Sequence, residues 1–324
     1  MDKSSFNAAP AVRPPKRLNV LPENPQQGCC GSSASVAIGR FPNWLHRPMP
    51  RGSALPETRE MIEGERLHTV CEEAKCPNRL DCWSRHTATF LVLGKACSRS
   101  CGFCEIDFAA APPPPDPEEP LRVAASVRSL GLNHVVITQV ARDDLEDGGA
   151  AHLVAIVEAL RADSPHVTVE LLTSDLGGCS KAWDLVISSR PDIFNHNIET
   201  VRLLSPKVRH KATYDRTLAL LSHVHSKGLL VKSGIMVGLG ETREQVEETL
   251  RDLKAVGCSI VTMGQYLQPS RRKLPVRSFV TPEQFEAYSC YGRSIGIPHM
   301  YCAPFMRSSY NAAQLLQEAR QGAH

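Results

Sequence analysis

The chain has 324 residues and a formal net charge of +3, from 37 Lys and Arg against 34 Asp and Glu. This length allows one large α/β domain or two ordinary domains, with a sizeable core. No apolar run approaches the roughly 18 to 20 residues of a membrane span, and the balanced charge points to neither nucleic acid nor an anionic membrane as a partner, so we expect a soluble cytoplasmic protein.

Residues 1–40 form the first segment, which is rich in Pro, Ser, Gly and Asn and has no sustained hydrophobic period. This composition is typical of a mobile arm. The arm is also basic and poor in acids, as organellar transit peptides are, so a mitochondrial or plastid location is the alternative. We expect the arm to end near Phe41 and Trp44, where aromatic side chains can dock on the body.

A first cysteine group follows, in which Cys71, Cys76 and Cys82 have the spacing C-x4-C-x5-C. Clustered cysteines in an intracellular chain indicate a metal site or catalysis, because cytosolic thiols are kept reduced. The group supplies three thiolates and lacks a fourth. Its compact spacing predicts one iron-sulfur cube, and the alternative is a set of buried apolar thiols.

From Thr87 onward, short β-rich runs alternate with segments of helical period. A helix is predicted over residues 151–162, where apolar residues recur at i, i+3, i+4 and i+7. The predicted strands span residues 89–93, 134–138, 167–172, 192–195, 229–236 and 259–265.

Two further helices have capping boxes at their starts, Thr242 with Gln245 and Thr281 with Gln284. Consecutive βα units predict an α/β fold with a parallel sheet, either an open doubly wound sheet or a barrel, complete or partial. In either case, the carboxyl ends of the strands and the loops after them should build the active site.

A second cysteine group follows the first strand of this series, with Cys97, Cys101 and Cys104 spaced C-x3-C-x2-C. Three thiolates on one tight loop can hold three irons of a [4Fe-4S] cube and leave the fourth iron open. The alternative is a zinc site short of one ligand, although structural zinc usually has four. Two separate groups of three favour two clusters over one shared site.

Four single cysteines lie in or beside periodic apolar segments, and we predict that they are buried, unreactive thiols. These single cysteines are Cys179, Cys258, Cys290 and Cys302.

The C-x3-C-x2-C loop, with Phe103 before its last cysteine, resembles that of the radical S-adenosylmethionine (SAM) superfamily. In that superfamily the open iron binds the amino and carboxylate groups of SAM, and one electron cleaves SAM to methionine and a 5′-deoxyadenosyl radical. The resemblance implies a partial (β/α)6 TIM-type barrel over residues 87–298. N-terminal and C-terminal extensions, 41–86 and 299–324, would carry an auxiliary cluster.

Longer motifs resemble the lipoyl synthase family more specifically. They begin with the C-x4-C-x5-C group, end with Arg307-Ser308-Ser309-Tyr310, and together cover roughly residues 41–311 in family order. The other matching motifs lie at residues 136–149, 194–200, 232–241 and 264–269.

The lipoyl synthase resemblance implies two [4Fe-4S] clusters with different protein ligands. Cys97, Cys101 and Cys104 would bind the SAM cluster. The other cluster would bind Cys71, Cys76, Cys82 and Ser309, with Ser308 as the less favoured fourth ligand. Cofactor-binding roles are implied for Phe103, Arg142, Asn195, Asn197, Glu199, Gly238 and Glu241. His196 fits a structural role and a substrate contact equally well.

This sequence departs from the family pattern beside the strand ends. Gln139 and Ala141 stand where Ser and Asp are expected, and His210-Lys211 replaces an expected Pro-Gly pair. Ser174 and Leu176 flank Asp175 unusually. None of these positions is an implied cluster ligand.

The resemblance implies insertion of two sulfur atoms, at C6 and C8 of an octanoyl chain on a carrier-protein lysine, with the auxiliary cluster as sulfur donor. A radical route is required because no side-chain base can remove a methylene hydrogen. Two rival readings are a biotin-synthase-like enzyme, which lacks the C-x4-C-x5-C group, and an electron carrier, whose cubes have four protein ligands. The implied partners are the glycine cleavage H protein, lipoyl domains of 2-oxo acid dehydrogenase acyltransferases, a flavodoxin- or ferredoxin-type reductant and a cluster carrier.

Overall fold

The structure, a computed structural model, describes residues 41–46, 67–84 and 89–321, with Pro56, Glu60 and Gly64 between them. The predicted arm at residues 1–40 lies outside the described residues. Where the description begins, the 3-10 helix η1 (Asn43–Leu45) follows Phe41. The Phe41 ring lies 5.7 Å from the Phe279 ring, so one aromatic side chain of this segment contacts the body as expected.

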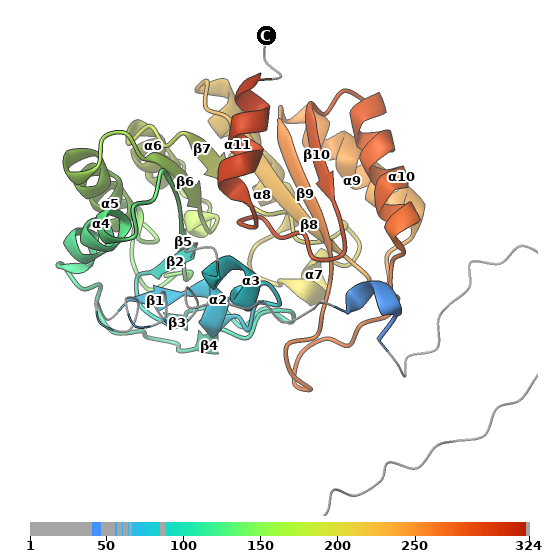
Figure 1. The fold of residues 1–324 in the computed structure, drawn as a ribbon, viewed down its shortest axis with the longest axis horizontal. Coiled ribbons are helices and arrows are strands. Elements are labelled where there is room, and N and C mark those ends of the chain that lie inside the picture. Colours follow the sequence, from blue (N-terminus) through green and yellow to red (C-terminus); the bar gives the residue numbers. More distant parts are fainter. Residues whose placement is uncertain are drawn as a thin grey trace, which may run out of the picture. The chain divides into compact units, whose positions relative to one another are not determined.

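One sheet of eight strands runs through the described part, in the order β1-β2-β5-β6-β7-β8-β9-β10 (Figure 1). β1 is antiparallel to β2, and every other neighbouring pair is parallel. The strands are β1 (His68–Thr69), β2 (Thr89–Val92), β5 (His134–Gln139), β6 (Thr168–Leu172), β7 (Ile193–Asn195), β8 (Val231–Val237), β9 (Ile260–Gln265) and β10 (His299–Cys302). A separate pair joins β3 (Ala96–Cys97) to β4 (Asp107–Phe108).

The strand order decides between the two predicted architectures. From β2 to β9 each strand lies beside the next strand of the series without a reversal, which is the winding of a barrel. β1 and β10 are the two edges, so among the described strands the barrel is open. All six predicted strands are present, whereas β1 and β10 were not predicted. β10 adds a parallel strand within the segment that we assigned to the C-terminal extension.

Most of the longer helices flank the strands on the outer side of the sheet, whereas α11 (Ala312–Gln321) packs Leu316 against Ile193 and Ile260 (Figure 1). The two predicted capping boxes start α9 and α10, and the helix predicted at 151–162 is α5. No helix in the described part is both long and apolar enough to cross a membrane. The longer helices are α4 (Glu119–Ser129), α5 (Ala150–Asp163), α6 (Ser180–Ser188), α8 (Tyr214–Ser226), α9 (Arg243–Ala255), α10 (Pro282–Ser294) and α11 (Ala312–Gln321). The short ones are α2 (Val70–Glu73), α3 (Arg79–Trp83), η2 (Leu176–Gly178) and α7 (Ser205–Val208).

A polar layer lies inside the barrel, on β6, β7 and β8. Glu170, Asn195 and Lys232 are each fully buried. Lys232 Nζ lies 2.9 Å from Glu170 Oε2, and Asn195 Nδ2 donates to Glu170 Oε1 at 2.7 Å. A buried charge pair of this kind joins neighbouring strands, because loss of one partner leaves an uncompensated charge that costs about 3–5 kcal/mol.

The C-terminal segment crosses the barrel mouth and meets the N-terminal extension. Asn78 Nδ2 donates to the Phe305 carbonyl at 2.8 Å, which joins the segment before α3 to residues far along the chain. Gly264, in β9, permits this path, since a Cβ there would lie 1.9 Å from the Met306 carbonyl oxygen. Both contacts bring the Arg307-Ser308-Ser309-Tyr310 motif beside the first cysteine group.

Candidate functional site

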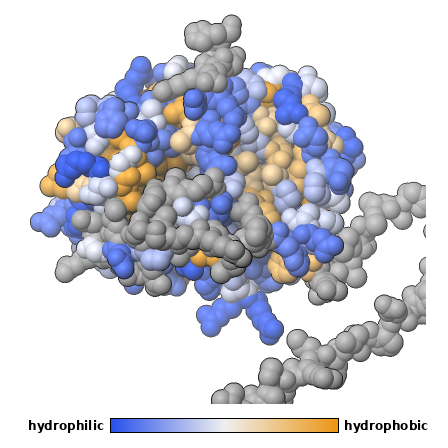
Figure 2. All heavy atoms as spheres, viewed as in Figure 1, coloured by the Kyte–Doolittle hydropathy of each residue, from blue (hydrophilic) through white to orange (hydrophobic). Residues whose placement is uncertain are grey.

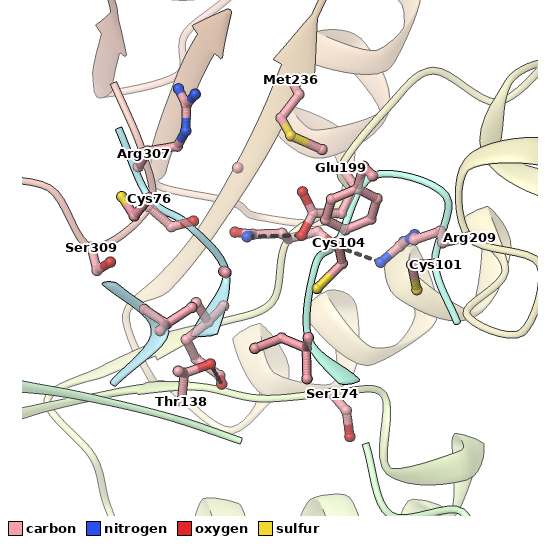
Figure 3. A pocket seen from close by; sticks show the side chains of 18 of the residues that line it. Cys76, Cys101, Cys104, Thr138, Ser174, Glu199, Arg209, Met236, Arg307 and Ser309 are labelled. Carbon is pink, nitrogen blue, oxygen red and sulfur yellow. Dashed lines mark hydrogen bonds between the residues drawn. The ribbon is translucent and has the colours of Figure 1, made fainter. Parts of the chain in front are cut away.

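A cavity of about 530 Å³ opens at the carboxyl ends of the parallel strands. Both cysteine groups contribute to its wall, and Figure 3 shows Cys76 and Ser309 on one side with Cys101 and Cys104 on the other. The strand ends supply residues such as Thr138. The site therefore lies where the βα pattern predicted it, and it brings together residues of the barrel and of both extensions.

The second cysteine group is held to the barrel by backbone and hydroxyl contacts. Ser98 donates from both its amide and its hydroxyl to the Ala141 carbonyl at 2.9 Å. The amides of Ala141 and Arg99 point at Cys97 Sγ, at 3.3 and 3.4 Å. Amide donors aimed at sulfur stabilise a thiolate, which is the form that binds iron.

The environment of the three sulfurs fits an iron cluster. Burial, and then the charge of Cys97, raise the pKa of Cys101 to about 11, and burial raises the pKa of Cys104 to about 12. Thiolates in such a place need a cation to offset their charge. Among the described residues, no three His, Cys, Asp or Glu side chains are grouped tightly enough for a single metal ion. Three thiolates spread around a cavity instead suit a cube of several irons.

A network of charged side chains holds the loop of the second cysteine group in place. Its centre is Arg99, whose side chain is 5% exposed. Arg99 makes a bidentate pair with Asp143 and lies 2.6 Å from the buried Asp175 carboxylate. Arg216 Nη1 reaches the other Asp175 oxygen at 2.9 Å. Burial alone would raise the pKa of Asp175, but Arg99 and other charged neighbours hold it below its usual value. Because Asp143 follows β5, Asp175 follows β6 and Arg216 belongs to α8, the network ties the loop of the second cysteine group to the barrel.

A second cavity, of about 220 Å³, lies beside the first cysteine group. Cys71, Cys76, Cys82 and Ser309 all line it, whereas Ser308 lines only the larger cavity. Burial raises the pKa of Cys71 to about 12, and the charge of Cys76 adds to this rise. Three thiols, of which Cys71 is buried, and one hydroxyl around a cavity are a donor set that fits an iron-sulfur cube.

Local structure places the first cysteine group. Thr69 caps α2, where its hydroxyl accepts from the Glu72 amide, and α2 carries Cys71. The chain then turns at Lys75, whose φ is 51°, so that the Cys76 amide donates to the Cys71 carbonyl at 3.1 Å. α3 brings Cys82 back toward them.

The predicted cofactor-binding residues fall into two sets. Phe103, Asn197 and Glu199 line the larger cavity. The remaining four, Arg142, Asn195, Gly238 and Glu241, do not line this cavity. Asn195 belongs to the polar layer, Arg142 is buried and pairs with Asp144, and Glu241 accepts from the amides of Gly238 and Leu239.

Glu199 lies in the loop after β7, where its backbone is held in the left-handed region with a φ of 65°. Its amide donates to the Gly234 carbonyl at 2.9 Å and its carbonyl accepts from the Met236 amide at 2.8 Å. Its carboxylate accepts from Asn197 Nδ2 at 3.0 Å. A Cβ at Gly234 would lie 2.7 Å from Asn197 Oδ1, so glycine leaves the room that Asn197 occupies.

Arg209 is a cavity residue that our sequence reasoning missed. It is 4% exposed, donates from Nη1 to the Asn197 carbonyl at 2.8 Å and pairs with Thr217. Burial raises the pKa of Glu199, and the charge of Arg209 offsets part of this rise. The His210-Lys211 departure directly follows Arg209, but nothing in the spacing marks Arg209 itself.

The structure gives His196 a buried position between a backbone carbonyl and a threonine hydroxyl. Its Nδ1 lies 2.8 Å from the Thr173 carbonyl and its Nε2 lies 3.2 Å from Thr217 Oγ1. Burial lowers the pKa of His196 to about 4, so the ring is neutral at physiological pH. His196 also lines the larger cavity.

The departures from the family pattern contact one another or the charge network. Gln139 Nε2 donates to Ser174 Oγ at 2.8 Å, across the ends of β5 and β6. Lys211 Nζ lies 3.3 Å from Asp143 Oδ2, so it extends the network around Arg99. Of the departing residues, Gln139, Ala141 and Ser174 line the larger cavity.

The prediction that all four single cysteines are buried is wrong for Cys290, which is exposed. On α10 the buried positions are Phe285, Ser289 and Gly292, so Cys290 lies on the outer face. Cys258 is buried, as predicted, and the other two single cysteines are partly exposed.

Comparisons with known proteins agree with this geometry. The family model of the Radical SAM superfamily matches residues 91–253. The crystal structure of methylornithine synthase is similar, with a TM-score of 0.52 and 13% identity over 71% of this chain and 68% of that chain. A maturase of the [FeFe]-hydrogenase gives a TM-score of 0.51 with 14% identity, over 65% of this chain and 49% of that chain. These two structures support the fold alone.

Curated relatives define the family more closely. Lipoyl synthase of Protochlamydia amoebophila (strain UWE25) is 61% identical over 310 residues, which cover 94% of this chain and 95% of that protein. Lipoyl synthase of Chlamydia felis (strain Fe/C-56) is 51% identical, over 96% of this chain and 95% of that protein. The chain therefore belongs to the lipoyl synthase family of radical SAM enzymes.

Proposed function

We propose that the chain inserts two sulfur atoms, at C6 and C8, into an octanoyl chain held on a lysine of a lipoyl-carrier protein. Membership of the lipoyl synthase family supports the reaction. The observation that carries the assignment of roles is that both cysteine groups face one cavity, with Cys76 and Ser309 opposite Cys101 and Cys104 (Figure 3). A substrate carbon in this cavity can approach both groups.

Cys97, Cys101 and Cys104 are assigned to a [4Fe-4S] cluster with SAM as its further ligand. When bound, this cluster and SAM supply the 5′-deoxyadenosyl radical that removes a hydrogen atom from carbon. The loop that carries these cysteines would position the cluster, because Ser98 and Arg99 hold it to the segments that follow β5 and β6. Two backbone amides are directed at Cys97 Sγ, and they hold this sulfur in place.

Asn197, Glu199 and Arg209 are assigned to SAM, because they offer an amide, a carboxylate and a guanidinium at one part of the cavity wall. Asn197 Oδ1 and Arg209 Nε are buried and form no hydrogen bond within the described structure. Buried polar atoms of this kind are usually satisfied by a ligand or by water. The carboxylate can accept from hydroxyl or ammonium groups, and the guanidinium can donate to a carboxylate.

Cys71, Cys76, Cys82 and Ser309 are assigned to the auxiliary [4Fe-4S] cluster. When bound, this cluster supplies the sulfur atoms. The serine oxygen is a harder donor and a weaker iron ligand in this setting than a thiolate, so it can be released while three thiolates hold the remainder. The Arg307 guanidinium, which donates to the Gln265 carbonyl at 2.9 Å, holds the serine segment against β9.

The partners follow from the same reaction. Octanoylated H protein of glycine cleavage and lipoyl domains of 2-oxo acid dehydrogenases present the acyl-lysine. A flavodoxin- or ferredoxin-type protein supplies electrons, and a cluster carrier restores the consumed auxiliary cluster. We assign the reaction to the cytoplasm.

Two single-cysteine variants test the division of roles. Each variant is incubated anaerobically with SAM, reductant and an octanoyl-lysine peptide, and the products are measured by mass spectrometry. Cys104→Ala should form neither 5′-deoxyadenosine nor sulfur-containing peptide. Cys82→Ala should still form 5′-deoxyadenosine but leave the peptide without sulfur. Cys290→Ala, an exposed cysteine, is the control and should behave as the unchanged protein. Sulfur insertion by Cys82→Ala would contradict the proposal.

A further inference from the structure

The segment after β9 carries three consecutive cations, Arg271, Arg272 and Lys273. We call residues 268–274 the basic loop. The residues that lead into these cations, Leu267 to Pro269, line the cavity, so the cations stand at its rim. Figure 1 shows the loop, in orange, extending past the end of β9, and strongly hydrophilic side chains project at the same place in Figure 2.

Hydrogen bonds fix the backbone of the basic loop. Within it, Gln268 Nε2 donates to the Lys273 carbonyl at 2.8 Å. Ser270 Oγ donates to Glu105 Oε2 at 2.9 Å, and Tyr266 donates to the Leu274 carbonyl at 2.7 Å. A surface segment that is already ordered loses little conformational entropy when a partner binds it.

The basic loop is also joined to the loop that carries Cys97, Cys101 and Cys104. The Leu274 amide donates to the Gly102 carbonyl at 2.9 Å, between Cys101 and Cys104. A Cβ on Gly102 would lie 2.9 Å from Leu274 Cδ1, so the two loops are in close contact. A partner on the basic loop would therefore lie next to the residues that surround the reacting carbon.

The charge of the basic loop is left largely uncompensated. In the described part of the chain, no carboxylate forms an ion pair with Arg271, Arg272 or Lys273, and the two arginines are exposed. Nearby, Lys75 adds a further cation and lies 2.8 Å from Glu105, so this carboxylate is already shared with lysine. Unpaired guanidinium groups on an ordered scaffold suit carboxylates, which they bind with two parallel hydrogen bonds.

We propose that the basic loop docks an acidic surface around the octanoyl-lysine of the carrier protein. This inference rests on the proposed function, because an acyl-lysine that enters the cavity brings its protein surface against the rim. Complementary charge at a rim speeds association and sets orientation. It thereby selects acyl-lysines with acidic neighbours.

Two octanoyl-lysine peptides of equal length test the proposal, one flanked by Asp and Glu and the other by Asn and Gln. The reconstituted full chain should show a KM for the acidic peptide about tenfold below that for the neutral peptide in low salt. At roughly 0.5 M salt the difference between the two KM values should shrink, because exposed charges are then screened within a few ångströms. Arg271→Glu with Arg272→Glu should abolish or reverse the preference while the neutral peptide reacts as before.

Lys181→Glu provides a charge-reversal control for the double variant, because Lys181 is an exposed cation on α6. It should leave the preference for the acidic peptide unchanged. Equal KM values for the two peptides, or equal losses for both in the double variant, would overturn the docking role. Binding of duplex DNA that the double variant abolishes, with no peptide preference, would instead assign the loop to nucleic acid. Failure of the proposed function looks different, because then SAM is cleaved and neither peptide gains sulfur.

Discussion

The Tyr310 hydroxyl donates a 2.8 Å hydrogen bond to Asp81 Oδ2, across a sequence separation of 229 residues. Asp81 directly precedes Cys82, and Tyr310 directly follows Ser309. The bond therefore fixes the distance between a proposed thiolate ligand and the proposed serine ligand of one cluster. We call this Tyr310–Asp81 hydrogen bond the latch, because it joins the N-terminal extension to the C-terminal extension.

Removal of this latch should weaken the auxiliary cluster alone. Tyr310→Phe loses one hydrogen bond, at about 1 kcal/mol, and leaves Ser309 less well placed. After anaerobic reconstitution and a chelator challenge, the variant should lose about half of its iron faster than the unchanged protein does, because one of two cubes is affected. Tyr291→Phe is the control, since it removes a hydroxyl bonded to Arg251 on the outer helices. Equal iron release in both variants would contradict the latch.

The buried carboxylate of Asp175 should be essential for the stability of the loop that carries Cys97, Cys101 and Cys104. Asp175→Asn keeps the size of the side chain but leaves Arg99 and Arg216 facing a neutral group. Loss of one partner in a buried ion pair costs about 3 kcal/mol or more. Urea unfolding of the reconstituted protein should show this loss, whereas Asp184→Asn, at an exposed ion pair, should change the free energy of unfolding by under about 1 kcal/mol. A cost at Asp175 no larger than at Asp184 would refute the argument.

His196 should make the protein less stable as the pH falls from neutral. Burial lowers the pKa of the folded-state ring to about 4, whereas an unfolded histidine has a pKa near 6.5. Between these values the unfolded chain binds a proton that the folded chain does not, so folding stability falls as the pH drops through this window.

The size of this effect can be isolated with one variant. From pH 7 to pH 5, His196 should account for a loss of about 2 kcal/mol in the free energy of unfolding. In His196→Gln that part of the pH dependence should vanish, although the variant is less stable at every pH. Urea unfolding at the two pH values measures both proteins. The same pH dependence in the variant would show that His196 does not cause it.

Gln139 and Ser174 should be energetically coupled. Each departs from the family pattern, and they form a direct 2.8 Å hydrogen bond. In a double-mutant cycle with Gln139→Ala and Ser174→Ala, the double variant should be destabilised by about 1 kcal/mol less than the sum of the single variants. Additive effects on the free energy of unfolding would show that the two substitutions are independent.

The barrel strands could be predicted because each is a short apolar run between turn signals. β1 and β10 escaped prediction, since β1 has two residues and β10 includes partly exposed positions. Cys290 was misjudged because its neighbours are apolar while the buried stripe of α10 runs one residue away.

The two cysteine groups, to which we assign the cluster-binding roles, could be recognised from spacing, because each group lies within one short segment. The partners of Arg99 and Arg209 could not be found this way, since they come from segments far apart in the sequence and depend on tertiary packing. The place of Ser309 beside Cys71, Cys76 and Cys82 came only from the family resemblance, and the shared cavity now supports it on geometric grounds.

The central claim is that one cysteine group serves SAM and the other supplies sulfur to the substrate. The most direct measurement uses protein reconstituted with heavy-isotope sulfide, freed of excess label, and incubated with SAM, reductant, octanoyl-lysine peptide and unlabelled sulfide in solution. Mass spectrometry of the first product should find two heavy sulfur atoms per peptide. Unlabelled sulfur in that product, or 5′-deoxyadenosine with an unmodified peptide, would contradict the account.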